Sequence, residues 1–415
     1  MKHPARTCFA LAFTTATFAI APAWAGQHGA AHYAEVQHGH YLVKAGDCAY
    51  CHTANNGKPF AGGRAVPTPF GTIYSSNITP DKDTGIGKWS EADLYHAMHT
   101  GVNREGEDLY PAFPYPWFTK VTPDDVKAIK AYLDTIKPVR QRNRAPDLPW
   151  PMSMRSVMAV WNKLYFSEGT FKPDPNQSAQ WNRGAYLVEG LGHCGACHTP
   201  KNMLGGTKHG DAFQGGHGEH AFAPNLTGGL RDGLGGWSKA EIVEYLKTGS
   251  NDKSSAAGPM ADEVYYSTQY LSDADLAAMA TYLKDMPKAG ANPPQHAATD
   301  NVVMVGGEVY ADNCSGCHMR SGEGQPGAFP PLKGSAAIQA EKPDTLIRIV
   351  LGGAAIPATR SKPTGLQMPA FNEKLSNNQI AAVLSFIRNA WGNRASVVSA
   401  SAVGKQRQQM EHGSD

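Results

Sequence analysis

The sequence predicts an all-α fold made of three small helical domains in tandem, and three observations support this prediction. A Cys-x-x-Cys-His motif occurs three times, as CAYCH, CGACH and CSGCH. An amphipathic helix with a clear start signal is expected downstream of each motif. A stretch of loop sequence after the first motif recurs after the second, which indicates a duplicated unit. The length of 415 residues suits two to four such domains.

The first 25 residues have the pattern of a secretory signal peptide. Lys2 and Arg6 supply a basic start, and an apolar stretch runs from Cys8 to Ile20. Ala23-Trp24-Ala25 then offers small residues for cleavage. The alternative is a membrane anchor, but the apolar stretch is too short to span a bilayer. We therefore expect an exported protein that has lost residues 1–25.

Without Lys2 and Arg6, the mature chain carries equal numbers of basic and acidic residues. A protein with so little net charge is a poor partner for nucleic acid. No later segment is a long uncharged apolar run, so we do not expect the mature chain to span a membrane.

All six cysteines of the mature chain lie in the three motifs, as Cys48, Cys51, Cys194, Cys197, Cys314 and Cys317. In an exported protein, six cysteines would ordinarily suggest disulfides. The close pairing and the histidine that follows each pair (His52, His198 or His318) favour haem instead. Each pair can form two thioethers with a porphyrin, and the histidine then binds the iron as proximal ligand. A zinc site would have to combine two pairs that lie far apart in sequence. We therefore expect three tandem class I-like cytochrome c domains, each wrapped around a covalently attached haem c group.

Each domain is expected to begin with a short apolar helix that brings the cysteines to the haem edge. These helices are marked by Gly39-His40-Tyr41-Leu42-Val43, Gly184-Ala185-Tyr186-Leu187-Val188 and Gly307-Glu308-Val309-Tyr310. The duplicated loop follows, as NITPDKDTGIGKWS from Asn77 and as NLTGGLRDGLGGWS from Asn225. These asparagines, with Trp89 and Trp237, are candidates to donate hydrogen bonds to haem propionates, and loop packing explains them equally well.

An amphipathic helix is expected to close each domain. Its start is marked by Thr122-Pro-Asp-Asp125, Ser272-Asp-Ala-Asp275 and Ser376-Asn-Asn-Gln379. Each segment places a hydroxyl at the N-cap and an acid or amide three residues later. Apolar residues then recur at helical spacing, so these helices are expected to pack on the core and on a face of the haem.

These signals divide the chain into seven parts. They are a signal peptide (1–25), a first domain (26–137), a linker with an amphipathic helix (138–175), a second domain (176–287), a linker (288–300), a third domain (301–393) and a polar C-terminal tail (394–415). The linker helix lies between Trp150 and Phe166 and is rich in Met and Trp. It either packs between domains or contacts a membrane or a partner.

The distal ligand of a low-spin haem is usually a methionine thioether. Met260 and Met368 lie beside proline at matching points before the closing helices, so we expect both to bind iron from loops. At this point the first domain has Phe113, which cannot bind iron. Met98 aligns with Leu246 and is expected to pack in the core. The first haem is therefore expected to be five-coordinate, or to bind water or Met98.

Long segments of the chain resemble the cytochrome c subunit of bacterial membrane-bound alcohol, gluconate or sorbitol dehydrogenases. The segments are YLVKAGDCAYCH, GTIYSSNITPDKDTGIGKWS, GHCGACHTP, GPMADEVYYSTQYLSDADL and MPAFNEKLS, and the likeness covers nearly the whole mature chain. The resemblance implies the same cysteine, histidine and methionine ligands. The family usually has YPAMPY where this chain has YPAFPY, so the axial role does not transfer to Phe113.

The resemblance also implies a function and partners. The chain is expected to pass electrons from a large periplasmic dehydrogenase subunit, which carries PQQ or FAD, to ubiquinone. This places it peripherally on the periplasmic face of the cytoplasmic membrane, and a small third subunit is compatible with the assembly. The chain itself is expected to hold no substrate-oxidising site.

Two other functions are open at this stage. One is a peroxidase-like haem enzyme that uses an open first haem, and the other is a free-standing periplasmic electron shuttle. The enzyme would need a distal acid–base group. His96 and His99 are near in sequence, but they align with Glu244 and Lys247, which predicts a solvated helix face.

Overall fold

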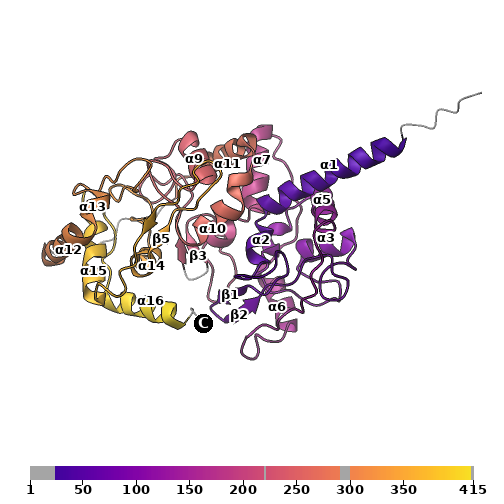
Figure 1. Cartoon of the computed structure of the whole chain (residues 1–415), viewed down its shortest axis with the longest axis horizontal. Helices are drawn as coiled ribbons and strands as arrows, with labels where there is room; N and C mark the ends of the chain where they lie inside the picture. Colours follow the sequence, from indigo (N-terminus) through magenta and orange to yellow (C-terminus); the bar gives the residue numbers. More distant parts are fainter. Residues whose placement is uncertain (1–23, 219–220, 290–299, 413–415) are drawn as a thin grey trace, which may run out of the picture.

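The structure is a computed structural model, and it describes residues 24–218, 221–289 and 300–412. Most of the predicted signal peptide and of the linker 288–300 lies outside these residues. Within them, helices form most of the regular structure, together with three two-stranded antiparallel hairpins. Figure 1 shows the first two domains beside each other and the third, in orange and yellow, at the other end of the molecule.

The three domains share an order of helices, but the hairpin of the third follows its middle helix, whereas in the first two the hairpin comes before it. The first contains α1 (Trp24–Ala45), α2 (Cys48–Cys51), β1 (Ala65–Thr68), β2 (Gly71–Tyr74), α3 (Glu91–Thr100), α4 (Tyr115–Phe118) and α5 (Pro123–Leu133). After the linker helix α6 (Ser156–Tyr165), the second contains α7 (Ala179–Tyr186), the π-helical turn η1 (Leu187–Leu191), α8 (Gly195–His198), η2 (His209–Asp211), β3 (Gly216–Gly218), β4 (Ala221–Ala223), α9 (Lys239–Thr248), α10 (Pro259–Tyr266), η3 (Thr268–Tyr270) and α11 (Asp273–Asp285). The third contains α12 (Asp300–Asn313), α13 (Ser315–His318), α14 (Asp344–Gly352), β5 (Ala354–Ala355), β6 (Gln367–Met368), α15 (Asn377–Ile387) and α16 (Ala400–His412).

In every domain the first helix crosses the closing helix, and a glycine lies at the crossing. The pairs are α1 with α5, α7 with α11, and α12 with α15. A Cβ atom on Gly39, Gly184 or Gly306 would lie 1.8, 2.0 or 2.2 Å from a carbonyl oxygen of the partner helix. Only glycine allows backbones to approach so closely. In the third domain the crossing residue is Gly306, one position before the start of the expected segment.

The second domain accommodates one extra residue between its crossing glycine and its first cysteine. Gly184 is one residue further from Cys194 than Gly39 is from Cys48. The chain absorbs this residue in the π-helical turn Leu187–Leu191, in which Gly192 N donates to Leu187 O at 2.7 Å. A single π-turn within a helix widens one turn and so accommodates the extra residue.

The predicted N-caps of the closing helices are present. Thr122, Ser272 and Ser376 each accept a hydrogen bond from the backbone N–H three residues later. Of these three closing helices, only α15 has a full capping box, which Gln379 completes. The equivalent acids of α5 and α11, Asp125 and Asp275, bond instead across the interface between the first and second domains.

That interface is a pseudo-twofold pairing of the duplicated units. Tyr41 Oη of the first domain donates to Asp275 Oδ2 of the second at 2.6 Å, and Tyr186 Oη of the second donates to Asp125 Oδ2 of the first at 2.5 Å. Tyr41 and Tyr186 hold the same position relative to their crossing glycines. The buried apolar residues of the two domains also form one continuous core, whereas the third domain has a core of its own. The first two domains therefore form a single unit.

The third domain meets the second through several polar contacts. Thr345 Oγ1 of α14 accepts from Phe222 N and donates to Phe222 O, which joins α14 to strand β4. Pro357 fills the space beside Gly249, where a Cβ would lie 2.5 Å from the proline ring.

The C-terminal segment expected to be a polar tail forms the helix α16, which lies against α14 and α15. Val403 is fully buried there, and Gln406 Nε2 donates to Asp344 Oδ1 at 2.9 Å. Nearby, the fully buried Arg388 donates to the carbonyl oxygens of Ile338, Ala340 and Ser396 at 2.8 to 3.0 Å. Few apolar residues were enough to hold this helix, so composition alone did not reveal it.

Candidate functional site

The three Cys-x-x-Cys-His motifs lie at equivalent places, immediately after the first helix of each domain. None of their six cysteines takes part in a disulfide. The second cysteines of two motifs, Cys197 and Cys317, are exposed, and the other four are partly buried. Among the described residues, no cluster of three or more His, Cys, Asp or Glu side chains is arranged to hold a metal ion. The pairs therefore remain separate, one to a domain, as haem attachment requires.

The three histidines share one hydrogen-bonding arrangement. Nδ1 of His52 lies 2.7 Å from Ser76 O, Nδ1 of His198 lies 2.7 Å from Pro224 O, and Nδ1 of His318 lies 3.0 Å from Pro330 O. A carbonyl oxygen can only accept, so Nδ1 carries the proton and Nε2 keeps its lone pair. This is the tautomer that binds a metal through Nε2, with a carbonyl that fixes the orientation of the ring.

The charge state of these histidines fits the same role. Burial lowers the pKa of His52, His198 and His318, and the bond to the backbone carbonyl opposes this only in part. Each imidazole is therefore neutral at neutral pH and able to donate an electron pair. Two thiols, a neutral oriented imidazole and an adjacent apolar core in each domain fit a haem c group.

The duplicated asparagines hold the loops that carry two of these carbonyls. Asn77 follows Ser76, is buried, and its Nδ2 donates to Val139 O at 2.8 Å. Asn225 follows Pro224, and its Nδ2 donates to Ala289 O at 2.8 Å. Each amide thus ties its loop to the segment that leaves the domain. Both asparagines therefore have a loop-packing role.

The two methionines expected as distal ligands lie in regular elements rather than in loops. Met260 is in the first turn of α10, directly after Gly258 and Pro259. Met368 is in strand β6 and pairs with Ala354 of β5. Both side chains are half-buried and pack against the core of their domain. Proline at the first helical position fixes the backbone that presents Met260.

Phe113 occupies the corresponding region of the first domain. Its ring lies 5.4 Å from that of Phe118 and 6.5 Å from that of Tyr115, so it belongs to an aromatic cluster. Met98 is 6% exposed and its counterpart Leu246 is 8% exposed, and both lie in the shared core. The equivalence of these two residues supports packing as the role of Met98.

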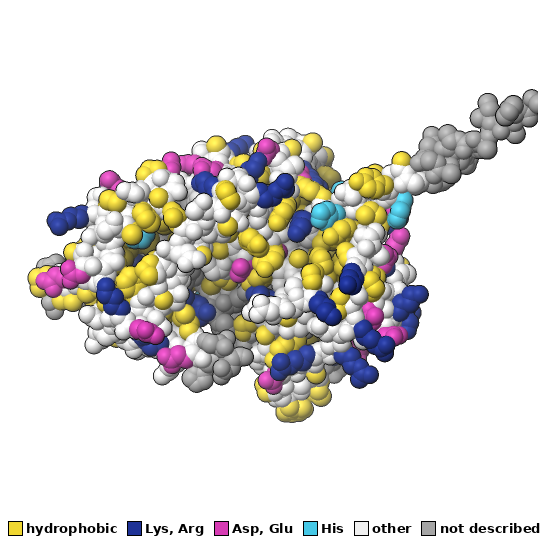
Figure 2. Space-filling view, in the orientation of Figure 1, with side chains coloured by type: hydrophobic (Ala, Val, Ile, Leu, Met, Phe, Trp, Pro, Cys, Tyr) yellow, Lys and Arg dark blue, Asp and Glu magenta, His cyan; other side chains and the backbone are white. Residues whose placement is uncertain are grey.

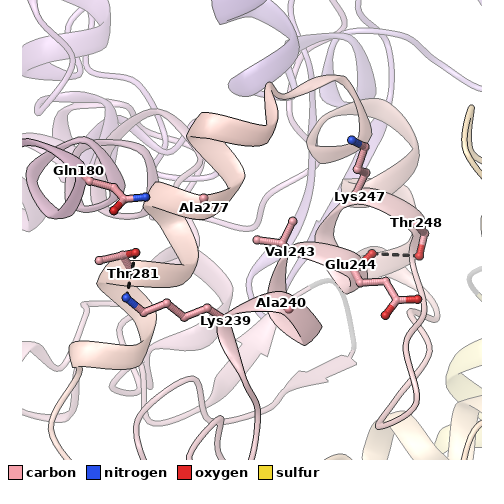
Figure 3. A pocket seen from close by; sticks show the side chains of 9 residues that line it. All are labelled: Gln180, Lys239, Ala240, Val243, Glu244, Lys247, Thr248, Ala277 and Thr281. Carbon is pink, nitrogen blue, oxygen red and sulfur yellow. Dashed lines mark hydrogen bonds between the residues drawn. The ribbon is translucent and has the colours of Figure 1, made fainter.

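His96 and His99 behave differently from each other. His96 is exposed, as expected, whereas His99 Nδ1 lies 2.9 Å from Thr119 O and its ring stacks on Tyr95. Their counterparts in the second domain, Glu244 and Lys247, line an open groove between α9 and α11 (Figure 3). In this groove Lys239 Nζ donates to Thr281 Oγ1, and no predicted haem ligand lines it. The second-domain face is therefore open surface, whereas the solvated position expected for His99 is wrong, because its ring packs between Thr119 and Tyr95.

Each of the first two domains places an aromatic side chain on the haem attachment loop of the other. A Cβ on Gly195, inside the CGACH motif, would lie 2.1 Å from the ring of Trp117, which belongs to α4 of the first domain. Reciprocally, Tyr266 of α10 lies 5.6 Å, ring to ring, from Tyr50, inside the CAYCH motif. The two attachment loops are therefore brought together by the pseudo-twofold pairing. Periodicity in the sequence carries no signal for contacts between domains, and these residues were not anticipated.

Comparison with known proteins identifies the family. The cytochrome c family profile matches residues 36–137, 182–287 and 303–391, one match for each domain. The chain belongs to the cytochrome c family. Its three domains carry three c-type haems and make it an electron-transfer protein.

Relatives of this triheme cytochrome c are similar over nearly their whole length. It is 40% identical over 403 residues to the cytochrome c subunit of the alcohol dehydrogenase (quinone) of Gluconobacter oxydans (strain 621H), covering 91% of this chain and 84% of the relative. It is 41% identical over 384 residues to the gluconate 2-dehydrogenase cytochrome c subunit of Pantoea cypripedii, covering 87% and 86%. It is 36% identical over 410 residues to the fructose dehydrogenase cytochrome subunit of Gluconobacter japonicus, covering 91% and 83%. The predicted resemblance to dehydrogenase cytochrome c subunits is confirmed.

Proposed function

We propose that this cytochrome c relays electrons from a large dehydrogenase subunit carrying PQQ or FAD, through three haems, to ubiquinone. The proposed haem-binding residues are the six motif cysteines, with His52, His198 and His318 as proximal ligands and Met260 and Met368 as distal ligands. When bound, the haems supply the one-electron chemistry. The protein contributes ligand orientation and apolar surroundings, which set reduction potentials.

The reciprocal contact between the attachment loops carries this proposal. Trp117 on Gly195 and Tyr266 on Tyr50 hold the first two haem-binding motifs against each other's domain. A protein that passes electrons between cofactors must hold its cofactor-binding motifs close together. One continuous apolar core lies beneath these contacts and joins the two domains.

We also propose that one surface of the molecule rests on the periplasmic face of the cytoplasmic membrane. In the described residues, no helix is both long and apolar enough to span a bilayer. The linker helix α6 buries Met158 and Trp161 in a cluster with Tyr110 and Tyr115. Its other face exposes Val160 and Leu164 at 62% and 63%.

The exposed face of α6 extends into a larger apolar patch. Trp161 Nε1 donates to Leu204 O at 2.8 Å, which joins α6 to a turn where Met203 is 94% exposed. Trp150, before α6, is 78% exposed. Figure 2 shows hydrophobic side chains along the lower edge of the molecule, where Figure 1 places α6. A protruding apolar edge with Trp, Leu and an adjacent Lys163 suits insertion into a lipid interface.

The relay is tested by isolating the chain, with an affinity tag, from membranes of its native host. We expect a large dehydrogenase subunit to co-purify. Adding the substrate of that subunit should reduce the haem iron in the complex, seen as a change in the haem absorption spectrum. A soluble ubiquinone analogue should then reoxidise it. A chain that purifies alone, or that consumes peroxide and ignores quinone, would contradict the proposal.

The membrane contact is tested separately with Val160→Ser and Leu164→Ser in one chain. These exposed positions are better probes than Trp161, whose ring is 9% exposed and packs in the core. We expect more of this variant in the soluble fraction without detergent. The matched control replaces Leu230, which is 76% exposed in the second domain, by Ser. Equal membrane recovery of the two proteins would exclude the α6 patch.

A further inference from the structure

The segment that leaves the first domain between α5 and α6 alternates in what its residues contact. We call residues 138–147 the strap. Among its odd-numbered residues, Val139 is buried and its N–H donates to Thr79 Oγ1 at 3.1 Å. Asp147 exchanges two backbone hydrogen bonds with Thr72 of β2, at 2.8 and 2.9 Å. Contacts at every second residue are the pattern of an extended strand that runs along the domain.

Two more odd-numbered side chains fasten the strap beside the first attachment motif. Gln141 Nε2 donates to Gly62 O at 3.2 Å, and Gly62 N donates to His52 O at 2.8 Å. Asn143 Oδ1 accepts from Asn77 N at 2.7 Å. The strap is therefore a fixed part of the surface of the first domain and not a loose linker.

The even-numbered residues between these anchors are arginines. Arg140, Arg142 and Arg144 are all exposed, and alternate residues of an extended chain lie about 7 Å apart on one side. Arg144 lies over the ring of Tyr74, with its guanidinium carbon 3.8 Å from the ring centroid. Arg140 reaches one carboxylate, that of Asp83, at 3.8 Å. Figure 2 shows Lys and Arg side chains gathered on the side where Figure 1 places the first domain. The row is a line of permanent positive charge.

The backbone of the three arginines is open as well. Val139 O and Gln141 O accept from Asn77 Nδ2, whereas the N–H and C=O groups of the arginines make no hydrogen bond within the described part of the chain. The outer edge of the strap is therefore unpaired. Such an edge is a template for another extended chain, and its charges decide which chain can approach. A row of arginines repels basic segments and attracts acidic ones.

The row does not belong to the apolar surface around α6. Ile73 of β2 packs against the α6 cluster, whereas its neighbour Tyr74 lies beneath Arg144. Successive residues of a strand point to opposite faces, so β2 separates the arginine row from α6. A lipid surface against α6 would therefore meet the opposite face of the hairpin. This arrangement favours a protein as the partner of the row.

We propose that the strap is a docking site for an extended acidic segment of a partner protein. The backbone of that segment pairs with the open edge, and its alternate carboxylates pair with Arg140, Arg142 and Arg144. Main-chain hydrogen bonds supply affinity in this mode of recognition, and alternate side chains supply specificity. A guanidinium offers a carboxylate two parallel N–H donors, which suits this pairing. The inference is independent of the proposed relay and of the α6 patch.

The experiment is calorimetric titration of the haem-loaded full-length protein with an acetylated peptide amide of alternating threonine and glutamate, as long as the strap. We expect binding that weakens as salt is added. A variant with Arg140→Gln, Arg142→Gln and Arg144→Gln should bind about tenfold more weakly or worse, because it loses three exposed ion pairs. The matched control carries the same change at three exposed arginines of the third domain, and should bind like the wild type. Its positions are Arg320, Arg360 and Arg394.

Two further peptides separate the parts of the proposal. A peptide with glutamine in place of glutamate should bind weakly or not at all. A peptide with the same charge but N-methylated threonines lacks alternate N–H donors, and it should also lose affinity. A wild type that binds neither acidic peptide, or a triple arginine variant that binds as the wild type does, would overturn the proposal. Equal binding of the N-methylated peptide would overturn the strand pairing, and binding of anionic vesicles alone would overturn the protein partner.

Hydrogen exchange gives a measurement that needs no variant. The acidic peptide should slow exchange of the backbone amides of Arg140, Arg142 and Arg144, which are open in the free protein. The amides of α15, in the third domain, should exchange as before. Unchanged exchange along the strap at saturating peptide would overturn the proposal even if the arginine variant fails to fold.

Discussion

Gly306 provides a sharp test of the helix crossing that organises each domain. It lies in α12, and a Cβ at this position would be 2.2 Å from Ala382 O and 2.6 Å from Phe386 Cβ. Its neighbour Gly307 is in the same helix, and its added Cβ would be 3.4 Å from the nearest atom, an edge of the Phe386 ring. Gly306→Ala and Gly307→Ala therefore make the same chemical change in two different environments.

The expected magnitudes follow from these contacts. In Gly307→Ala, the better helix propensity of alanine should stabilise α12 by about 0.5–1 kcal/mol. In Gly306→Ala, α12 and α15 would have to separate by about 1 Å, which weakens the dispersion contacts along the crossing. Overpacking of this kind typically costs about 1–3 kcal/mol. Both variants gain the same helix propensity, so they should differ in the free energy of local opening by the overpacking cost alone, about 1–3 kcal/mol.

Hydrogen exchange followed by mass spectrometry on the haem-loaded chain measures this difference. Peptides from α12 and α15 should exchange at least about fivefold faster in Gly306→Ala than in Gly307→Ala. Peptides from the first domain serve as the internal reference and should be unaffected. Equal protection of the two variants would show that the crossing is loosely packed and would refute the role given to this glycine.

Three further predictions concern other parts of the molecule. Trp117→Ala removes the ring that covers Gly195 and should destabilise the pairing of the first two domains by about 2 kcal/mol or more, seen as faster exchange in the CGACH peptide. Arg388→Met leaves two buried carbonyl oxygens and a half-buried one without their donor and should cost at least about 3 kcal/mol, seen as a lower Tm of the third domain. Phe113→Met should supply a thioether to the first haem and remove a high-spin signal from the low-temperature EPR spectrum of the oxidised protein.

Each of these predictions has a result that would contradict it. Unchanged exchange in Trp117→Ala would mean that the contact is incidental. Arg394→Ala is the control for Arg388, because Arg394 is exposed and should change stability by less than about 0.5 kcal/mol. A similar Tm for both arginine variants would argue against the buried network. Three purely low-spin signals in the wild type would rule out an open first haem.

Local patterns predicted the units of the fold well. The N-caps at Thr122, Ser272 and Ser376 are present because a hydroxyl before a periodic apolar run specifies a helix start through its own hydrogen bonds. The equivalence of Met98 and Leu246 followed from the repeat, and both lie in the shared core. Such features depend on a few neighbouring residues, and this is why they could be identified without the structure.

Features that depend on partners distant in sequence were missed. Two adjacent glycines in α12 look alike in sequence, and only the position of α15 shows that Gly306 is at the crossing. Asp125 looked like half of a capping box, but Tyr186 of the other domain takes its carboxylate. Met260 was expected in a loop, although Pro259 is a recognised residue at the first turn of a helix and could have indicated α10. The pairing of domains decided these outcomes.

The pseudo-twofold interface has a consequence for how the two halves could diverge. In a homodimer every substitution appears on both sides, so losing a methionine would affect both copies at once. When the two copies are joined in one chain, they stay together at high effective concentration. Each copy can then acquire substitutions that the other does not share. Tyr41 to Asp275 and Tyr186 to Asp125 still hold the shared geometry. Within that fixed frame one copy carries Phe113 and the other Met260, so a symmetric scaffold presents different side chains at equivalent positions.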